Sequence, residues 1–483
     1  MPREPRTPIG RAADAAGRAI GAAAEQHFRR RHVSRLRRTG HLSAQAPIGA
    51  LGAGGFGVRE GNDVRVLIDG EDAFAAMASA IEGARRTIHL TGWSADPAFA
   101  MSRADPRRTL GALLAGAGER GVRTRVLLWR GAPLPVIHPS RADNAAAARG
   151  FNAIDGVTCA LDAHEYLLDC HHEKLLIVDD EIAFVGGLDL TALRSDRWDT
   201  TGHPPRDSDD GHDAAVRATG PVVADVVAHF GQRWGEVTGE RLPASAVPEA
   251  MGTIAARLIR TIPERVYRFA PDGDFGALGA YLDALGAAER FVYLENQFLW
   301  APEIVDVLAA KLRRPPRDDF RVVVVLPDHA HTGQDATLGQ LSRLRDEDAG
   351  RRLLALTVQS EEPGHHVYVH AKIGIVDDRW LTVGSVNLNT HSLLNDTEVN
   401  LAFAVPDLAR SVREDLFREH MGQDAAGVDP VAFVDGVLRP LAEEQTRRRA
   451  AGLPPTGRVR SVEQGGRRTD LLLGPISSIV VDG

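Results

Sequence analysis

One stretch of the sequence occurs twice. Residues 172–191 read HEKLLIVDDEIAFVGGLDLT, and residues 370–389 read HAKIGIVDDRWLTVGSVNLN. The two stretches align without gaps at an offset of 198 residues, and nine of their twenty positions are identical. A weaker similarity, at an offset of 204, relates residues 80–90 (AIEGARRTIHL) to residues 284–294 (ALGAAERFVYL). Because this period is far too long for a solenoid, it predicts two copies of one domain, each contributing half of one site.

Helical and extended patterns alternate in both copies, which predicts an α/β fold. In each copy the repeated stretch reads as two short strands joined at an Asp-Asp turn, 174–178 with 182–186 and 372–376 with 381–384. The other expected strands are 64–68, 87–90, 124–129, 291–294, 321–326, 353–359 and 479–481. The expected helices are 73–85, 109–118, 222–238, 275–288, 302–313 and 337–345.

We therefore expect two tandem homologous α/β domains with mixed sheets, related by a pseudo-two-fold axis and sharing one active site. The expected divisions are an Arg-rich leader and Gly/Ala linker at 1–62, the two domains at 63–245 and 246–441, and a charged, irregular tail at 442–483.

The composition limits the class of protein. The chain has 483 residues, of which 43% are hydrophobic and 25% charged, as in ordinary globular proteins. Its net charge of −8 makes a general nucleic-acid binder unexpected, because phosphate contacts by basic residues supply most non-specific affinity. Residues 1–40 nevertheless carry ten Arg and three acids. This leader could be an amphipathic helix or a disordered tail, and its basic side chains could bind an anionic membrane surface.

Two cysteines, Cys159 and Cys170, exclude a disulfide framework and a Cys-rich zinc site. No apolar run approaches the 18 residues of a membrane-spanning helix. The N-terminal region lacks a compact apolar segment ending in a small-residue cleavage site, so export is not expected. We expect a cytoplasmic protein that could bind peripherally at the inner membrane face.

Lysine is rare in this chain. Of 57 basic residues only three are Lys, and two of them, Lys174 and Lys372, follow a motif His by two positions. Since Arg serves elsewhere, these positions indicate a need for a compact ammonium group. The third, Lys311, lies in a helical context and receives no predicted role.

The spacing of the motif suggests its chemistry. Residues i and i+2 of a strand share one face, so His172 lies with Lys174 and His370 lies with Lys372. Two ammonium groups, with donors from Ser385 and Asn387, would form a cradle for a tetrahedral phosphate. A pair of histidines suits a two-step reaction in which one attacks phosphorus and the other acts as general acid and base.

Metal binding is the other option for these histidines. His366 and His370 have a four-residue spacing, but in an extended strand they would lie about 13 Å apart, too far to share an ion. The first copy lacks a counterpart of His366, and a Lys beside each motif His would repel a cation. We therefore expect neither a metal nor a cofactor.

The doubled pattern His-x-Lys-x-x-x-x-Asp resembles the phospholipase D superfamily, over roughly residues 63–441. Residues 171–174, 186–190, 197–200 and 294–298 are similar to segments of its phosphatidylcholine-cleaving branch, and 384–387 match its Gly-Ser-x-Asn element.

The resemblance implies roles for individual residues. His172 would be the nucleophile and His370 the general acid and base, while Lys174, Lys372 and Asn387 would hold phosphate oxygens. Asp213 and Glu398 match the carboxylates that orient the catalytic histidines. Asp179 and Asp377 complete the two catalytic motifs, and the resemblance implies that they hold the turn beneath the site.

Two departures bear on the branch. Residues 186–189 read Gly-Gly-Leu-Asp instead of Gly-Ser-x-Asn, which is typical of the phospholipases and argues against a cardiolipin synthase. His391-Ser392 stands where an Arg-Ser pair often follows.

The function implied is a phosphodiesterase, a phospholipase D that releases phosphatidic acid and a head-group alcohol through a covalent phosphohistidine, with transphosphatidylation as a side activity. The alternatives are a cardiolipin-synthase-type phosphatidyl transferase, a nucleic-acid phosphodiesterase and a non-catalytic phospholipid-binding scaffold. Because one chain holds both half-sites, we expect a monomer acting on a phospholipid at the membrane surface.

Overall fold

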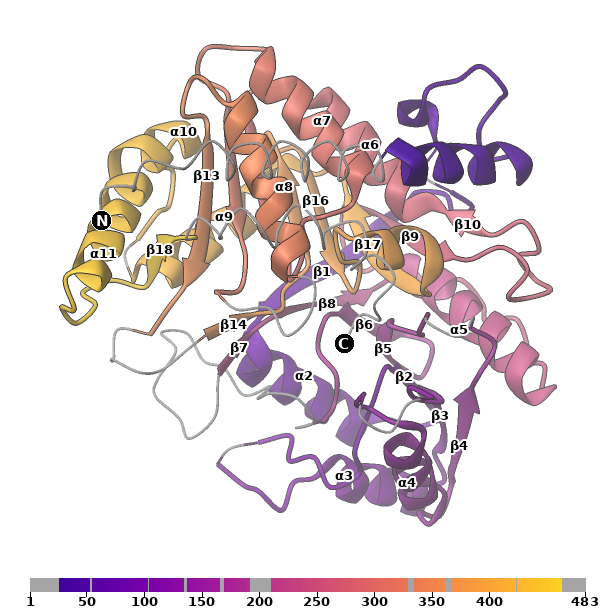
Figure 1. Cartoon of the computed structure of the whole chain (residues 1–483). Helices are drawn as coiled ribbons and strands as arrows, with labels where there is room; N and C mark the ends of the chain where they lie inside the picture. The colour runs from indigo at the N-terminus through magenta and orange to yellow at the C-terminus, as the bar shows by residue number, and fades with distance from the viewer. Residues whose placement is uncertain are drawn as a thin grey trace.

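The computed structural model describes residues 26–52, 54–102, 104–133, 137–165, 169–191, 210–328, 334–360, 367–422 and 424–462. The motif at 197–200, His366 and the expected strand at 479–481 lie outside these residues. We refer to β1–β8 with α2–α5 as the first half, and to β9–β18 with α6–α11 as the second half (Figure 1).

One mixed sheet of sixteen strands runs through the described part of the chain, in the order β18-β13-β12-β11-β15-β16-β17-β9-β1-β8-β6-β5-β2-β3-β4, with β10 paired to β9. Apart from β18, the order along this path is symmetric about the antiparallel contact of β9 with β1. The first-half strands are β1 (Arg59–Ile68), β2 (Thr87–Gly92), β3 (Arg123–Trp129), β4 (Val157–Asp162), β5 (Lys174–Val178), β6 (Ile182–Gly186) and β8 (Ala214–Thr219). The second-half strands are β9 (Ile254–Ile262), β10 (Asp274–Phe275), β11 (Phe291–Glu295), β12 (Arg321–Val325), β13 (Leu353–Val358), β15 (Ile373–Val376), β16 (Trp380–Gly384), β17 (Glu398–Phe403) and β18 (Val459–Ser461).

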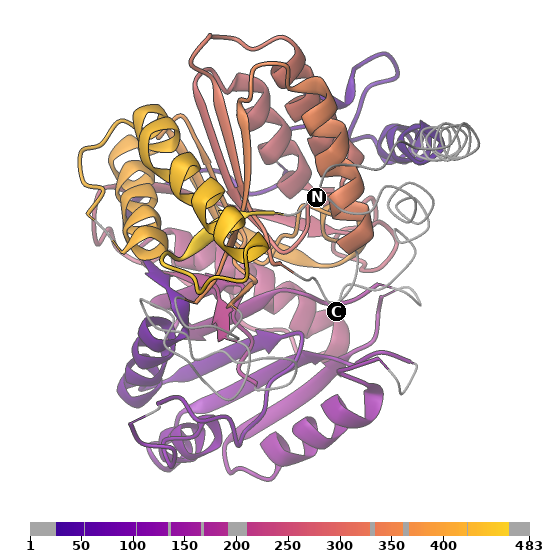
Figure 2. The same ribbon diagram turned by 60° about the vertical axis from the view of Figure 1, so that its left-hand side comes forward.

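Helices cover the outer faces of this sheet, as the two stacked halves in Figures 1 and 2 show. On the first half these are α2 (Asp69–Gly83), α3 (Leu110–Glu119) and α4 (Arg141–Asn152), which share one apolar core with the strands. On the second half they are α6 (Gly276–Ala287), α7 (Pro302–Arg313) and α8 (Gln334–Glu347).

A third core joins the halves. It contains side chains of β5, β6 and β8 together with β15, β16 and β17, and also those of α5 (Val222–Thr238) and α9 (Pro406–Met421). The inner faces of the two halves therefore pack on each other, which explains why the central strands are apolar on both faces. A separate two-stranded ladder pairs β7 (Asp210–His212) with β14 (Val367–Val369).

The predicted fold class is confirmed: two related α/β halves with mixed strands, here joined in one sheet. β5, β6, α5 and α7 have the expected bounds. The elements α4, β4, β8, β9, β17 and α9 were not predicted from the sequence.

The expectation of an irregular segment after residue 441 is wrong for its described part. α11 (Arg439–Ala450) is a helix, and β18 extends the sheet by pairing with β13. The sequence of α11, RPLAEEQTRRRA, has few apolar residues, so hydrophobic periodicity could not reveal it. Its Ala, Arg, Glu and Gln residues are good helix formers. The remaining connecting elements are a 3-10 turn η1 (Ile48–Ala50), a π-helix η2 (His391–Asn395), α10 (Pro430–Phe433) and a second π-helix η3 (Val434–Leu438).

The described part of the leader is ordered. Residues 26–38 are helical, and Leu36 is fully buried in the core of α6 and α7. Within the described ranges, no helix is both long and apolar enough to cross a membrane.

Candidate active site

The two motif histidines lie side by side between the halves of the molecule. The ring centroids of His172 and His370 are 6.4 Å apart, with an angle of 64° between the ring planes. His172 lies two residues before the start of β5, and His370 lies between β14 and β15. Both are nearly buried, at 5% and 7% exposure. The repeat thus brings its two copies to one site, as the sequence predicts.

Each histidine is held by a carboxylate from the opposite half. His172 Nδ1 lies 3.0 Å from Glu398 Oε1, and His370 Nδ1 lies 2.6 Å from Asp213 Oδ2. A carboxylate at Nδ1 favours the tautomer that carries its proton there, which leaves the basic lone pair on Nε2. Asp213 and Glu398, the two acids expected to orient the histidines, therefore contact them. Each acid belongs to the half that does not contain its histidine.

Main-chain hydrogen bonds hold each histidine next to the carboxylate of the opposite half. On one side the amide of His172 donates to Thr397 O at 3.0 Å, and the amide of Thr397 donates to Cys170 O at 3.1 Å. On the other side β14 pairs with β7, and the amide of His370 donates to His212 O at 2.8 Å. Each histidine segment is thus tied to the segment that carries its carboxylate, so the side-chain pair is set by the backbone.

The two lysines have different neighbours. Lys372 Nζ donates to Gln297 Oε1 at 3.4 Å, and Asn387 Nδ2 lies 3.5 Å from the same oxygen. Lys174 Nζ instead lies 3.3 Å from Asp189 Oδ2 and 6.0 Å from the centre of the Trp93 ring. In the second half the ammonium thus contacts the amide oxygen of Gln297, whereas in the first half a carboxylate lies beside it.

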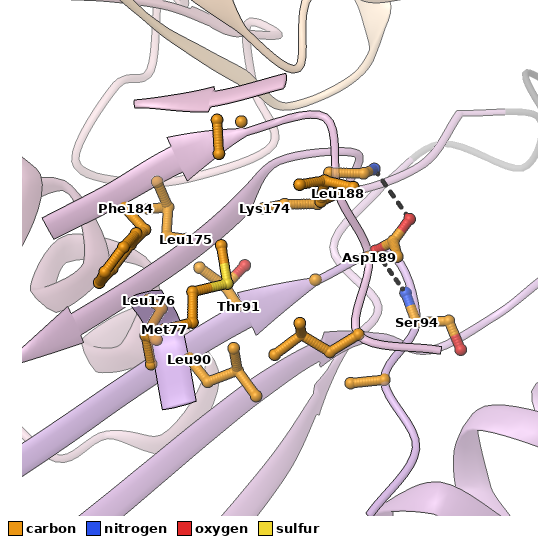
Figure 3. Close-up of a pocket in the computed structure, with 15 residues that line it drawn as sticks. Met77, Leu90, Thr91, Ser94, Lys174, Leu175, Leu176, Phe184, Leu188 and Asp189 are labelled. Carbon is orange, nitrogen blue, oxygen red and sulfur yellow. Dashed lines mark hydrogen bonds and ion pairs between the residues drawn. The ribbon is translucent and has the colours of Figure 1, made fainter. Parts of the chain in front are cut away.

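Asp189 is built into the first half. Its Oδ1 accepts hydrogen bonds from the amides of Trp93 at 3.1 Å and Ser94 at 3.3 Å. Figure 3 shows Lys174 and Ser94 on either side of this carboxylate. Beyond them lies an apolar pocket whose wall includes Met77 and Phe184. Two amides and an ammonium stabilise a charged Asp189, so it offsets the positive charge of Lys174.

Ser385 has a different place from the one expected. Its hydroxyl donates to Glu398 Oε2 and lies 3.2 Å from Val399 O, and it accepts from the amide of Val399 at 3.1 Å. Ser392 donates to the other oxygen of Glu398 at 2.5 Å. The prediction that Ser385 binds phosphate is therefore corrected: its hydroxyl holds the carboxylate that orients His172.

The same geometry explains the Gly-Gly departure in the first half. A Cβ at Gly187, the counterpart of Ser385, would lie 2.2 Å from Asp213 Oδ1. Asp is one methylene shorter than Glu, so its carboxylate lies closer to its own backbone and occupies the space that the Ser385 side chain fills in the second half. The pairs Gly187 with Asp213 and Ser385 with Glu398 are two alternative ways to place a carboxylate at a histidine.

The motif aspartates lie away from the histidines. Asp179 accepts hydrogen bonds from the amides of Arg85, Arg86 and Thr87 at 2.7–2.9 Å, and Asp377 accepts from those of residues 289–291 at 2.7–2.8 Å. Each follows the strand that begins near its motif Lys, and five residues of strand span about 16 Å. Their inclusion among the catalytic residues is therefore corrected: they hold the turns that precede β2 and β11, as the resemblance implies.

A buried group of charged side chains lies behind His370. His212 Nδ1 lies 2.9 Å from Asp69 and 3.2 Å from Glu419, and its Nε2 lies 2.8 Å from Glu295. His420 Nε2 lies 2.5 Å from the other oxygen of Glu295. Burial disfavours a charged His212, but these carboxylates outweigh burial and raise its pKa well above the usual value. Burial likewise opposes ionisation of Glu295, yet the two histidines hold its pKa below the usual range.

These residues could in principle hold a metal ion. Ligands of a tetrahedral zinc site, at about 2.0–2.2 Å from the ion, lie roughly 3.3 Å apart. The contacts of Glu295 with His212 and His420, at 2.8 and 2.5 Å, are shorter and use different oxygens. We therefore interpret the group as an ion-pair network that supports β7, the strand leading to Asp213.

The sequence alone did not predict a role for Trp93, Asp189, Gln297 or Ser392. The repeat could have drawn attention to three of these residues. The offset of 204 aligns Trp93 with Gln297, and the offset of 198 aligns Asp189 with Asn387. Positions that align but differ in chemistry mark where the half-sites diverge. Ser392, on the π-helix η2, had no such signal.

Two models of known protein families match this chain. Residues 80–208 match the family model described as "Phospholipase D", and residues 281–420 match "Cardiolipin synthase, PLD-like domain". The chain belongs to the phospholipase D superfamily.

Curated relatives include Phospholipase D A of Dictyostelium discoideum, 26% identical over 440 residues that cover 73% of this chain and 33% of that protein. Phospholipase D1 of Saccharomyces cerevisiae is 22% identical over 507 residues, which cover 78% of this chain and 30% of the relative. The chain thus spans about a third of the length of these relatives. The crystal structure of phosphatidylserine synthase from Haemophilus influenzae Rd KW20 superposes with a TM-score of 0.50 at 13% identity, covering 80% of this chain and 94% of that one. This similarity supports the superfamily fold.

Proposed function

We propose that this protein is a phospholipase D, which cleaves the distal phosphodiester bond of a glycerophospholipid to give phosphatidic acid and a head-group alcohol. The observation that carries the proposal is the pair of adjacent histidines, each with a carboxylate at Nδ1. The Gly-Gly-Leu-Asp sequence and the phospholipase D relatives support this branch of the superfamily.

In the first proposed step, Nε2 of His172 attacks phosphorus. A nitrogen–phosphorus bond forms, and the bond from phosphorus to the head-group oxygen breaks. His370, protonated and stabilised by Asp213, gives its proton to the departing oxygen. Glu398 stabilises the positive charge that develops on the His172 ring. Lys174, Lys372 and Asn387 would hold the non-bridging oxygens, where negative charge increases.

In the second step His370 acts as a base. It takes a proton from water, whose oxygen attacks phosphorus and displaces His172. Phosphatidic acid then leaves, and both histidines return to their starting states. If an alcohol replaces water, the same step forms a new phosphodiester, which is the transphosphatidylation expected as a side activity.

A phosphatidyl transferase of cardiolipin-synthase type is the second candidate, because the family model that matches residues 281–420 carries that description. It would share the phosphohistidine and differ in its acceptor. For either activity the substrate lies in a membrane, so we propose peripheral binding to a phospholipid surface. One chain can supply the complete site, which supports action as a monomer.

The test mixes purified protein with phosphatidylcholine vesicles and a few per cent ethanol, with His172→Ala and His370→Ala alongside. We expect choline, phosphatidic acid and phosphatidylethanol from the wild type and about 10⁴-fold less from either variant. Cardiolipin formed from phosphatidylglycerol, without release of phosphatidic acid, would favour the transferase. Absence of every product, also with phosphatidylethanolamine and phosphatidylglycerol, would contradict both functions.

A further inference from the structure

The helical segment 26–38 is attached to the second half by buried and charged contacts. Leu36 is fully buried against α6 and α7. His32 Nδ1 lies 2.7 Å from Glu303 Oε1 at the start of α7, and Arg29 lies 2.8 Å from Asp306 on the same helix. A solvated tail would make none of these contacts, so the segment is part of the fold.

Arg35 contacts residues outside α6 and α7. Its Nε donates to both oxygens of Glu264, at 2.8 and 2.7 Å. Its Nη1 donates to Asn395 Oδ1 at 2.6 Å, and its Nη2 donates to Leu394 O at 2.7 Å. The side chains of Arg35 and Glu264 are only 15% and 12% exposed. The planar guanidinium therefore joins three chain segments at a largely buried point.

Two of these contacts are at the C-terminal end of the π-helix η2. The last carbonyl groups of a helix have no partner within the helix, and a cationic donor placed there satisfies them. Arg35 supplies such a donor to Leu394 O and also fixes the side chain of Asn395. The end of η2 is thus held from outside by the N-terminal segment.

The residues that follow η2 hold the proposed nucleophile. Asp396 Oδ1 accepts from the amide of Cys170 at 2.7 Å, and Thr397 exchanges main-chain hydrogen bonds with the segment that ends at His172. Glu398 is the carboxylate at His172 Nδ1. Ser392, inside η2, donates to Glu398 as well. A shift of η2 would therefore move both the backbone and the carboxylate that set the position of His172.

We propose that Arg35 is a positioning residue for His172, and that the N-terminal segment is an integral part of the active site. It acts through η2 and the segment 396–398, without contact with the reacting atoms. This inference rests on the proposed function for its catalytic consequence, but its structural consequence can be measured separately.

The test compares Arg35→Ala with Arg29→Ala in the full chain. Arg29→Ala is the matched control, because it removes an ion pair of the same segment with Asp306 on α7, and Asp306 keeps its contact with Arg343. Hydrogen exchange is followed by mass spectrometry in peptides covering 169–173 and 391–398. Turnover is followed on phosphatidylcholine vesicles. Arg35→Lys tests whether charge alone suffices, and melting temperatures check that each variant folds.

For Arg35→Ala we expect faster exchange in both peptides and a fall in kcat of about 10–100-fold with little change in KM, because a misplaced nucleophile loses rate rather than binding. Arg35→Lys should recover only part of the loss, since a point charge cannot hold three partners at once. Arg29→Ala should leave exchange and kcat within about twofold of the wild type. Unchanged exchange in the two peptides, or faster exchange with an unchanged kcat, would overturn the proposal.

If the wild type has no phosphodiesterase activity, the proposed function fails. The hydrogen-exchange measurement still tests the positioning role of Arg35. Faster exchange at both peptides in Arg35→Ala alone would then support the positioning of His172 and Glu398 by the N-terminal segment. The same exchange in Arg29→Ala would overturn it, because it would show general loosening of the segment.

Discussion

His172 Nδ1 lies 3.0 Å from Glu398 Oε1, although the two residues are 226 positions apart and belong to different halves of the repeat. The equivalent contact in the other half-site joins His370 and Asp213, which are 157 positions apart. Neither half alone therefore contains a histidine with its orienting carboxylate. This exchange gives a physical reason for the two copies to stay on one chain with their inner faces packed together.

Neutralising either carboxylate should reduce catalysis without unfolding the protein. In Glu398→Gln and Asp213→Asn the side chain keeps its size, but it no longer stabilises the charged imidazole and can favour the wrong tautomer. We expect kcat to fall by about 10²–10⁴-fold, measured as choline release. Glu181→Gln, at an exposed ion pair with Arg86, is the control and should keep full activity. Activity within a factor of two of the wild type in both variants would contradict the assigned roles.

Replacing Gly187 should damage the first half-site through a steric clash. The new Cβ in Gly187→Ala would lie 2.2 Å from Asp213 Oδ1, so the carboxylate or the strand must move. We expect a loss of about 1–3 kcal/mol in the free energy of unfolding, together with lower kcat. Gly286→Ala is the matched control, because a Cβ there meets nothing within 4 Å. Equal stability of the two variants in urea denaturation would be inconsistent with the clash.

The sequence was sufficient for the central part of the fold because the signals there are local. The motif Lys with a four-residue apolar run, an Asp-Asp turn and a second apolar run predict β5 and β6 with their observed bounds. The repeat extends the same prediction to the second half. Strands such as β9 and β17 pair with strands that are distant in the sequence or not adjacent along the chain, so no hairpin pattern marks them. α11 was missed because its charged sequence has no apolar stripe.

The sequence predicted which carboxylates and histidines form the candidate site, but not which carboxylate pairs with which histidine. Two carboxylates and two histidines can pair within each half or across the halves, and only the packing of β7 on β14 and of 170–172 on 396–398 selects the second arrangement. The role of Ser385 was misjudged because sequence cannot tell whether a hydroxyl faces a substrate or a neighbouring acid. The attachment of residues 26–38 depends on partners more than 200 positions away.

The motif aspartates should affect stability more than chemistry. Asp179→Ala removes the acceptor of three amide donors and places Ala at a positive φ of 57°. We expect a loss of about 3 kcal/mol in the free energy of unfolding. Asp179→Asn tolerates this backbone conformation and keeps one acceptor oxygen, so it should lose less. The fraction that remains folded should retain kcat within about threefold, measured by active-site-normalised turnover; a far larger loss in folded protein would restore a catalytic role.

Asp189 should set how strongly the site holds anions. Asp189→Asn removes the carboxylate 3.3 Å from Lys174 and makes the first half-site resemble the second. We expect inorganic phosphate to inhibit this variant about 5–10-fold more strongly, since an additional uncompensated positive charge at a nearly buried site is worth about 1 kcal/mol or more. Asn387→Asp is the reciprocal variant and should weaken inhibition by a similar factor. Inhibition constants unchanged in both variants would exclude these positions from the phosphate cradle.

His89 should make the fold sensitive to acid. Burial and the charge of Arg125 lower the pKa of His89 to about 4, compared with about 6.5 when unfolded. The unfolded chain therefore takes up a proton first as the pH falls, so stability is complete above about pH 6.5 and declines toward pH 4. The loss from this group amounts to about 3 kcal/mol. His89 stacks on Phe230, with ring centroids 4.7 Å apart, so His89→Phe keeps an aromatic ring there and removes the titrating group. Urea unfolding between pH 7 and 4 should give a shallower pH dependence for His89→Phe, and identical slopes would show that His89 is not the group responsible.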